Sequence, residues 1–131
     1  MNHPIDIKEN TDEISNVVIG CAIEVHKQLG PGLLESVYEQ CLFYELKIAG
    51  LDIYRQFEKP VIYKNLIIGH GYKIDLFIPD FLVIELKTVE KLLPVHKSQI
   101  LTYMRLCSVS TGLLINFYTT LLKNGIKRIV L

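Results

Sequence analysis

Three charged residues near the middle of the chain have the side chains that metal-assisted phosphodiester hydrolysis uses. They are Asp75, Glu85 and Lys87, in a segment where charged and aliphatic residues alternate on either side of a Pro-Asp turn. Magnesium is held by one or two protein carboxylates together with substrate phosphates, and a nearby ammonium stabilises charge that develops on phosphate. If the three side chains share one face of a hairpin, the sequence therefore predicts a hydrolytic site.

Parity supports that arrangement. Directly opposed residues of an antiparallel pair point to the same side of a sheet. Because 75 and 85 sum to an even number, a loop with an odd number of residues, such as 79–81, places Asp75 and Glu85 on the same side. One expected face carries Lys73, Asp75, Phe77, Val83, Glu85 and Lys87, and the other carries Ile74, Leu76, Ile78, Leu82, Ile84 and Leu86. The second set is wholly aliphatic, so its burial should fix the register and aim the carboxylates. Pro79 and Asp80 belong to the turn, and the metal-binding role falls to Asp75.

Each candidate residue also has a structural interpretation. The hairpin charges would equally suit a solvated face with cross-strand ion pairs, each worth at most about 1 kcal/mol. Glu35, near the start of a predicted helix, offsets the helix dipole, or acts with Tyr38 on the same helix face toward the polar side of the hairpin. Gln99 and Tyr103 lie four residues apart on a later helix, where they form a polar flank or orient water and phosphate. The residue pattern alone leaves these alternatives open.

Periodicity predicts the elements that must position these residues. Helical spacing of apolar residues is found at 10–29, 33–49 and 94–107, and the period of two typical of strands at 53–63, 66–78, 82–88, 112–117 and 126–131. Asn10 is the expected N-terminal cap of the first helix, and Pro60 indicates an edge strand or a bulge. The order is ααβββαββ. A helix between strands requires a crossover and a parallel pair, so we expect an α/β fold with a mixed β-sheet packed against helices.

Composition limits the alternatives. The chain has 131 residues, half of them hydrophobic, which suits one folded domain spanning 1–131. Its formal net charge is zero, so a nucleic-acid surface would have to come from local clustering of basic side chains. No apolar run reaches the length of a membrane span, and the N-terminus lacks a signal-peptide pattern. We therefore expect a cytoplasmic protein that does not enter membranes.

Four segments carry a resemblance to a known family. Residues 32–38 read Gly-Leu-Leu-Glu-Ser-Val-Tyr, a GxxExxY motif, and the segments Gly71–Leu76, Ile84–Lys87 and Leu92–Tyr103 follow in order. On these segments the chain closely resembles the small bacterial and archaeal GxxExxY proteins, which are grouped with the PD-(D/E)XK nuclease superfamily. The resemblance extends over nearly the whole chain, from about Ile14 to the end.

The resemblance implies a restriction-endonuclease-like core with a metal site for magnesium or manganese. Asp75 and Glu85 would coordinate the ion, the carbonyl of Leu86 would complete the shell, and Glu35 would be the helical acidic residue of the site. Lys87 would place or activate the attacking water, and Gln99 and Tyr103 match the glutamine and tyrosine found after the catalytic strand in exonuclease-like branches. The implied catalytic residues are Glu35, Asp75, Glu85, Lys87, Gln99 and Tyr103. Lys73 stands where many relatives are expected to carry arginine, and lysine keeps the charge but cannot bind a phosphate through two parallel hydrogen bonds.

Two classes of function follow. The first is a metal-dependent nuclease acting on DNA or RNA; the second is a catalytically inactive nuclease-fold module that binds nucleic acid or a protein partner. A homodimer would suit either class, because substrate grooves in such small folds often need two subunits. The expected phosphate contacts are Arg55, Lys59, Lys64, Lys73, Lys91 and Lys97, and the expected base-stacking residues are Tyr54, Tyr63 and Tyr72.

Overall fold

The structure, a computed structural model, describes residues 10–131. Its helices and strands follow the predicted order, with a short 3-10 helix, η1, that the sequence patterns did not indicate. The elements are α2 (Thr11–Leu29), α3 (Glu35–Ile48), β1 (Tyr54–Tyr63), β2 (Leu66–Ile78), β3 (Leu82–Lys87), α4 (Pro94–Leu106), β4 (Thr111–Asn116), η1 (Leu122–Gly125) and β5 (Ile126–Val130). Among these helices, none is long and apolar enough to cross a membrane.

The ends of α2 show the predicted local chemistry. The side-chain oxygen of Asn10 accepts hydrogen bonds from the backbone N–H groups of Asp12 and Glu13, which satisfies two donors that lack partners at a helix start. The helix ends at Gly30, whose φ of 70° lies in the left-handed region that favours glycine. The predicted cap at Asn10 is thus confirmed.

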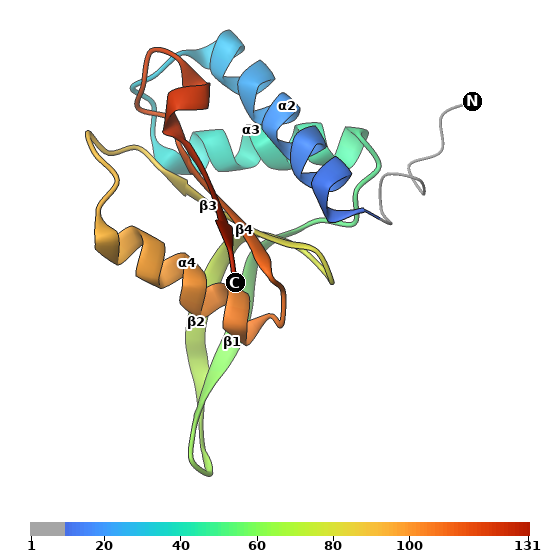
Figure 1. The fold of residues 1–131 in the computed structure, drawn as a ribbon, viewed down its shortest axis with the longest axis vertical. Coiled ribbons are helices and arrows are strands. Elements are labelled where there is room, and N and C mark those ends of the chain that lie inside the picture. Colours follow the sequence, from blue (N-terminus) through green and yellow to red (C-terminus); the bar gives the residue numbers. More distant parts are fainter. Residues whose placement is uncertain (1–9) are drawn as a thin grey trace.

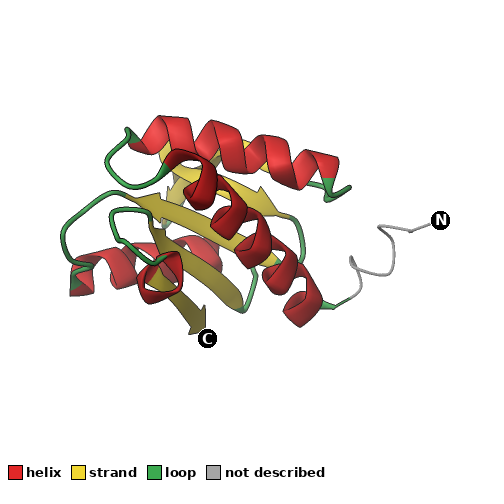
Figure 2. Cartoon of the chain, turned by 90° about the horizontal axis from the view of Figure 1, so that it is seen from above, coloured by secondary structure: helices red, strands yellow, loops and turns green. Residues whose placement is uncertain are grey.

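The five strands form one mixed sheet in the order β1-β2-β3-β4-β5. The β3–β4 pair is parallel, because α4 carries the chain across the sheet between them, and the other pairs are antiparallel. Helices α2 and α3 cover one face of the sheet and α4 covers the opposite face (Figures 1 and 2). The predicted mixed sheet flanked by helices is therefore confirmed.

The hairpin register agrees with parity over its paired residues. Leu76 lies opposite Ile84, Phe77 opposite Val83, and Ile78 opposite Leu82. The aliphatic residues of both strands pack under α2 and α3: Leu76, Ile78, Leu82, Ile84 and Leu86. Phe77 and Val83 are buried on the other face, beneath α4. Both faces of the hairpin are thus covered, and the second face is not simply polar.

Ile74 departs from the parity argument. It was expected on the aliphatic face, but it packs in the cluster under α4. The neighbouring strand explains the change, because Gln56 of β1 has a φ of 51° and the ladder passes from the Arg55–Leu76 pair directly to the Phe57–Ile74 pair. As a result, residues two apart on either side of Asp75 point to opposite faces of the sheet: Leu76 lies under α2 and α3, whereas Ile74 lies under α4.

The β1–β2 hairpin extends beyond the rest of the sheet (Figure 1). Strand β1 lies at the sheet edge, and its register shifts between Lys59 and Val61, so Pro60 marks both an edge strand and a bulge, as predicted. The far end of the hairpin turns at 64–65 and exposes the apolar side chains of Ile62, Tyr63, Leu66 and Ile67.

Asn116, at the end of β4, holds the segment that leaves β3. Its side-chain amide accepts from the Val89 N–H at 3.1 Å and donates to the Val89 carbonyl at 2.8 Å. Gly125 of η1 packs directly against this residue: a Cβ built on Gly125 would lie 2.2 Å from the Asn116 carbonyl oxygen. The close approach of η1 to β4 therefore requires glycine at 125.

We expect Gly125→Ala to lower the free energy of unfolding by about 1–3 kcal/mol, because two backbone segments must separate to admit the methyl group. The matched control is Gly20→Ala in α2, where nothing lies within 4 Å of the added Cβ. That variant should be more stable than the parent by about 0.5–1 kcal/mol, since alanine loses less conformational entropy in a helix. Chemical denaturation measures both changes, and equal stability of the two variants would contradict the packing argument.

Candidate active site

Asp75 and Glu85 meet where β2 and β3 separate. The ladder between these strands ends at the Leu76–Ile84 pair. Beyond it, the backbone N–H of Asp75 donates to Glu85 Oε1 at 2.9 Å, and the backbone N–H of Leu86 donates to Asp75 Oδ2 at 2.9 Å. Each carboxylate therefore binds the backbone of the opposite strand in place of a ladder hydrogen bond. This crosswise arrangement fixes both side chains against rotation.

The two carboxyl groups are held together at an electrostatic cost. Glu85 is only 3% exposed and Asp75 is half-buried. Burial raises the pKa of both groups, and the charge of Asp75 raises the pKa of Glu85 further, whereas Lys87 acts in the opposite direction. A cation between them would offset this repulsion, so the pair has the electrostatics of a metal-binding site.

The second oxygen of each carboxylate remains reachable. Among the side chains that the structure describes, the Ser15 hydroxyl is the one wholly buried oxygen or nitrogen without a hydrogen-bond partner. Asp75 Oδ1 and Glu85 Oε2 accept no hydrogen bond from a described residue, so both retain some access to solvent. Two accessible oxygens on adjacent strands suit magnesium, which takes one or two carboxylates and completes its octahedron with water and substrate oxygens.

The described residues do not gather three or more His, Cys, Asp or Glu side chains into a metal-binding group. Glu35, the first residue of α3, therefore does not complete such a cluster with Asp75 and Glu85. Glu35 nevertheless interacts electrostatically with the site: burial raises the pKa of Glu35, while the charge of Lys87 lowers it. The same carboxylate contributes to the raised pKa of Asp75 and Glu85.

Glu39 is a site residue that sequence reasoning missed. It lies one helical turn after Glu35 and is 4% exposed, and its carboxylate accepts from Arg55 Nε and Gln56 Nε2, each at 2.6 Å. Burial is the main cause of the raised pKa of Asp75, and the charge of Glu39 raises it more than the charge of Glu35 does. The available signal was the i, i+4 spacing of two glutamates, which places them on one helix face.

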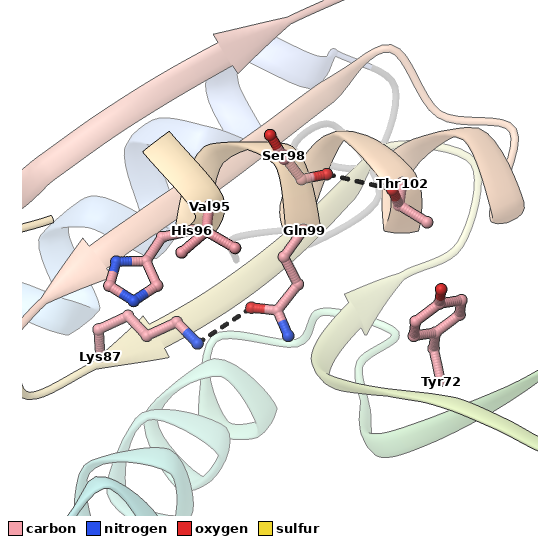
Figure 3. Close-up of a pocket in the computed structure, with 7 residues that line it drawn as sticks. All are labelled: Tyr72, Lys87, Val95, His96, Ser98, Gln99 and Thr102. Carbon is pink, nitrogen blue, oxygen red and sulfur yellow. Dashed lines mark hydrogen bonds between the residues drawn. The ribbon is translucent and has the colours of Figure 1, made fainter. Parts of the chain in front are cut away.

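A hydrogen-bonded chain connects β3 to α4. Lys87 Nζ donates to Gln99 Oε1 at 3.0 Å, and Gln99 Nε2 donates to the Tyr103 hydroxyl at 2.9 Å (Figure 3 shows the first of these bonds). Burial raises the pKa of Tyr103 to about 12, so the phenol keeps its proton and remains a donor. The Gln99 amide thus fixes the position of the Lys87 ammonium. The structure brings Lys87, Gln99 and Tyr103 together.

Tyr38 and Arg55 are not placed as the sequence suggested. Tyr38 was paired with Glu35 as a residue facing the polar side of the hairpin, but it is fully buried, donates to the Gly30 carbonyl and stacks on Phe117. Its role is to hold the loop before α3. Arg55, an expected phosphate contact, is paired with Glu39.

A cavity of about 470 Å³ opens beside Lys87, on the side of α4. Figure 3 shows the His96 ring next to the Lys87 side chain at one end, Gln99 in the middle and Tyr72 at the other end. The lining residues are Tyr72, Lys87, Val95, His96, Ser98, Gln99 and Thr102. The cavity therefore shares Lys87 and Gln99 with the hydrogen-bonded chain described above.

Comparison with protein families identifies the class. A family model described as PD-(D/E)XK nuclease superfamily matches residues 12–129, which is nearly the whole chain. The protein belongs to this superfamily, and its mixed sheet flanked by helices is the restriction-endonuclease-like fold that the resemblance implied. A search of curated proteins and a search of solved structures found no match. The closer resemblance to GxxExxY proteins stays a prediction.

The raised carboxyl pKa values predict how stability depends on pH. Between about pH 4.3, the usual Glu pKa, and their raised pKa values in the folded protein, these carboxyl groups hold more protons in the folded than in the unfolded state. Their contribution to stability in metal-free buffer should therefore fall as pH rises through this window. Glu85→Gln keeps the acceptor oxygen and removes one charge. At pH 8 we expect this variant to be more stable than the parent, by about 1.4 kcal/mol for each pH unit over which folded Glu85 keeps a proton that the unfolded chain has lost.

Thermal denaturation at several pH values in a chelating buffer measures this effect. Glu58→Gln is the matched control, because Glu58 is exposed and its ion pair with Lys73 is long, at 3.8 Å. A Glu85→Gln protein that loses stability at pH 8 would show that the carboxylate pair is not repulsive.

Proposed function

We propose that this protein is a magnesium- or manganese-dependent nuclease that hydrolyses phosphodiester bonds in DNA or RNA. The observation that carries the proposal is the crosswise Asp75–Glu85 pair with Lys87 two residues further along β3. Membership of a nuclease superfamily supports the reaction class. The pair also has two accessible oxygens and a repulsion that a divalent cation would offset.

The ion would be held by Asp75 and Glu85, with the Leu86 carbonyl as the further ligand that the resemblance implies. Glu35, the helical acidic residue of the resemblance, does not gather with this pair and would act on the ion through an intervening water. When bound, a divalent metal supplies Lewis-acid polarisation of the scissile phosphate and neutralises its charge. The protein contributes fixed ligand geometry, because both carboxylates are already bonded to backbone N–H groups. Little reorganisation is then needed at the moment of reaction.

Lys87 is the proposed catalytic cation. Gln99 holds its ammonium, which leaves two further N–H donors for a water molecule and a phosphate oxygen. Tyr103 keeps its own proton and anchors the amide from the far side, so it acts chiefly as a positioning residue. The chain Tyr103–Gln99–Lys87 thereby sets where negative charge on phosphate is stabilised.

We expect magnesium-dependent cleavage of labelled DNA or RNA, with Lys87→Met lowering kcat by about 10²–10³-fold because a donor aimed at developing charge is lost. KM should change much less than kcat. Lys27→Ala, an exposed lysine in the last turn of α2, is the control and should retain full activity. Binding of the same strands without any metal-dependent cutting would instead favour the inactive binding module.

Manganese or magnesium should raise the unfolding temperature of the parent protein. At a metal concentration of 100 times Kd the gain is about 2.7 kcal/mol, a shift of several degrees. Asp75→Asn should lose this gain because one anionic ligand is replaced by an amide, whereas Glu58→Gln should keep it. Differential scanning calorimetry in the absence of nucleic acid tests the metal site independently of turnover, and an equal metal effect in both variants would remove Asp75 from it.

A further inference from the structure

His96 lies in the cavity beside Lys87 and has no part in the proposed chemistry so far. Its Nδ1 atom accepts a hydrogen bond from the backbone N–H of Leu93 at 3.0 Å, and this bond caps the start of α4. Since Nδ1 accepts, the neutral ring carries its proton on Nε2. The cap therefore fixes the tautomer and leaves Nε2–H as a donor.

The other end of the cavity is aromatic. Tyr72 of β2 is 40% exposed and makes an edge-on contact with Tyr103, with ring centroids 5.4 Å apart. That contact fixes one side of the ring while a part of it still faces the cavity (Figure 3). Exposed aromatic rings of this kind stack on unpaired bases, whatever the base. The cavity thus has donors for phosphate at one end and a stacking surface at the other.

The cavity is large enough for a small ligand such as one nucleotide. Its volume of about 470 Å³ falls within the roughly 300–1,000 Å³ of small-ligand pockets. In a duplex the faces of each base are covered by its neighbours, so a base can reach Tyr72 only when it is unpaired. Lys87 and Gln99 line the same cavity, which joins it directly to the proposed reaction centre.

We propose that this cavity binds one unpaired nucleotide of the substrate, with its phosphate accepting from His96 Nε2–H and its base against Tyr72. The inference rests on the proposed nuclease function and narrows its substrate to single-stranded nucleic acid or an unwound end. Of the three tyrosines expected to stack on bases, it selects Tyr72. Tyr63 lies near the far end of the β1–β2 hairpin and is not among the cavity residues.

Binding tests the proposal separately from cutting. Fluorescence anisotropy of short labelled DNA and RNA single strands, and of the matching duplexes, is measured with full-length Glu85→Gln protein in magnesium, so that strands stay intact. We expect single strands to bind at least tenfold more tightly than duplexes. Tyr72→Ala should weaken single-strand binding by about tenfold, the order expected for one stacked base, while Tyr72→Phe and the control Tyr63→Ala should not.

His96 is tested by variants that keep the helix cap. Glutamate and glutamine at this position accept the Leu93 N–H as histidine does, so α4 should still form. His96→Glu replaces the donor with a negative charge and should weaken single-strand binding by about tenfold, whereas His96→Gln, which keeps an N–H donor, should lose less. Nitrogen-15 NMR should show the Nε2–H tautomer in the free protein and a shift of its signal when the single strand is added.

The outcomes separate this inference from the nuclease proposal. Equal binding of duplex and single strand, a Tyr72→Ala protein that behaves like Tyr63→Ala, or an Nδ1–H tautomer would each overturn the nucleotide subsite. Metal-dependent cleavage by the parent protein would still stand in those cases. Conversely, binding that depends on Tyr72 and His96 without any cleavage would retain the subsite and overturn the nuclease.

Discussion

The crosswise hydrogen bonds between two carboxylates and two backbone N–H groups are the constraint on which the site depends. Strands β2 and β3 stop pairing after Leu76 and Ile84, and a buried strand end cannot leave its backbone donors without partners. Asp75 and Glu85 supply those partners, each to the opposite strand. The same bonds that close the end of the ladder therefore hold two like charges together, so the structural role of these carboxylates and their proposed metal-binding role depend on the same atoms.

Where these two strands separate, residues from helices on both faces of the sheet influence the same pair of carboxylates. Glu35 and Glu39 of α3, which packs on one face, influence the pKa of Asp75. Tyr103 of α4, on the opposite face, responds to the charges of Glu85 and Asp75. Lys87 extends this link, because it is bonded to Gln99 of α4 and also lowers the pKa of Glu35. A continuous sheet would have kept these two groups of residues apart.

Local pattern determined much of this arrangement, and tertiary contacts determined the rest. A period of two and an odd loop were enough to place the paired part of the hairpin, and the missing N–H of Pro60 was enough to locate the bulge. Ile74 was misplaced because Gln56 of the neighbouring strand has a left-handed backbone conformation, and its side chain is bonded to Glu39 of a helix, a contact that no strand pattern contains. Tyr38 was misread for a similar reason: its partners are Gly30 and Phe117, and only folding brings Phe117 near.

Gly125 shows that the supports of the candidate site extend beyond its sequence motifs. It permits η1 to lie against Asn116, and Asn116 in turn holds Val89, two residues after Lys87. A relative that kept every charged residue but acquired a side chain at this glycine would match the superfamily at each recognised position, although the packing of η1 against Asn116 would be lost. If the proposed reaction is correct, its loss in such a protein would leave the charged residues of the site unchanged and would have to be sought in the residues that support them.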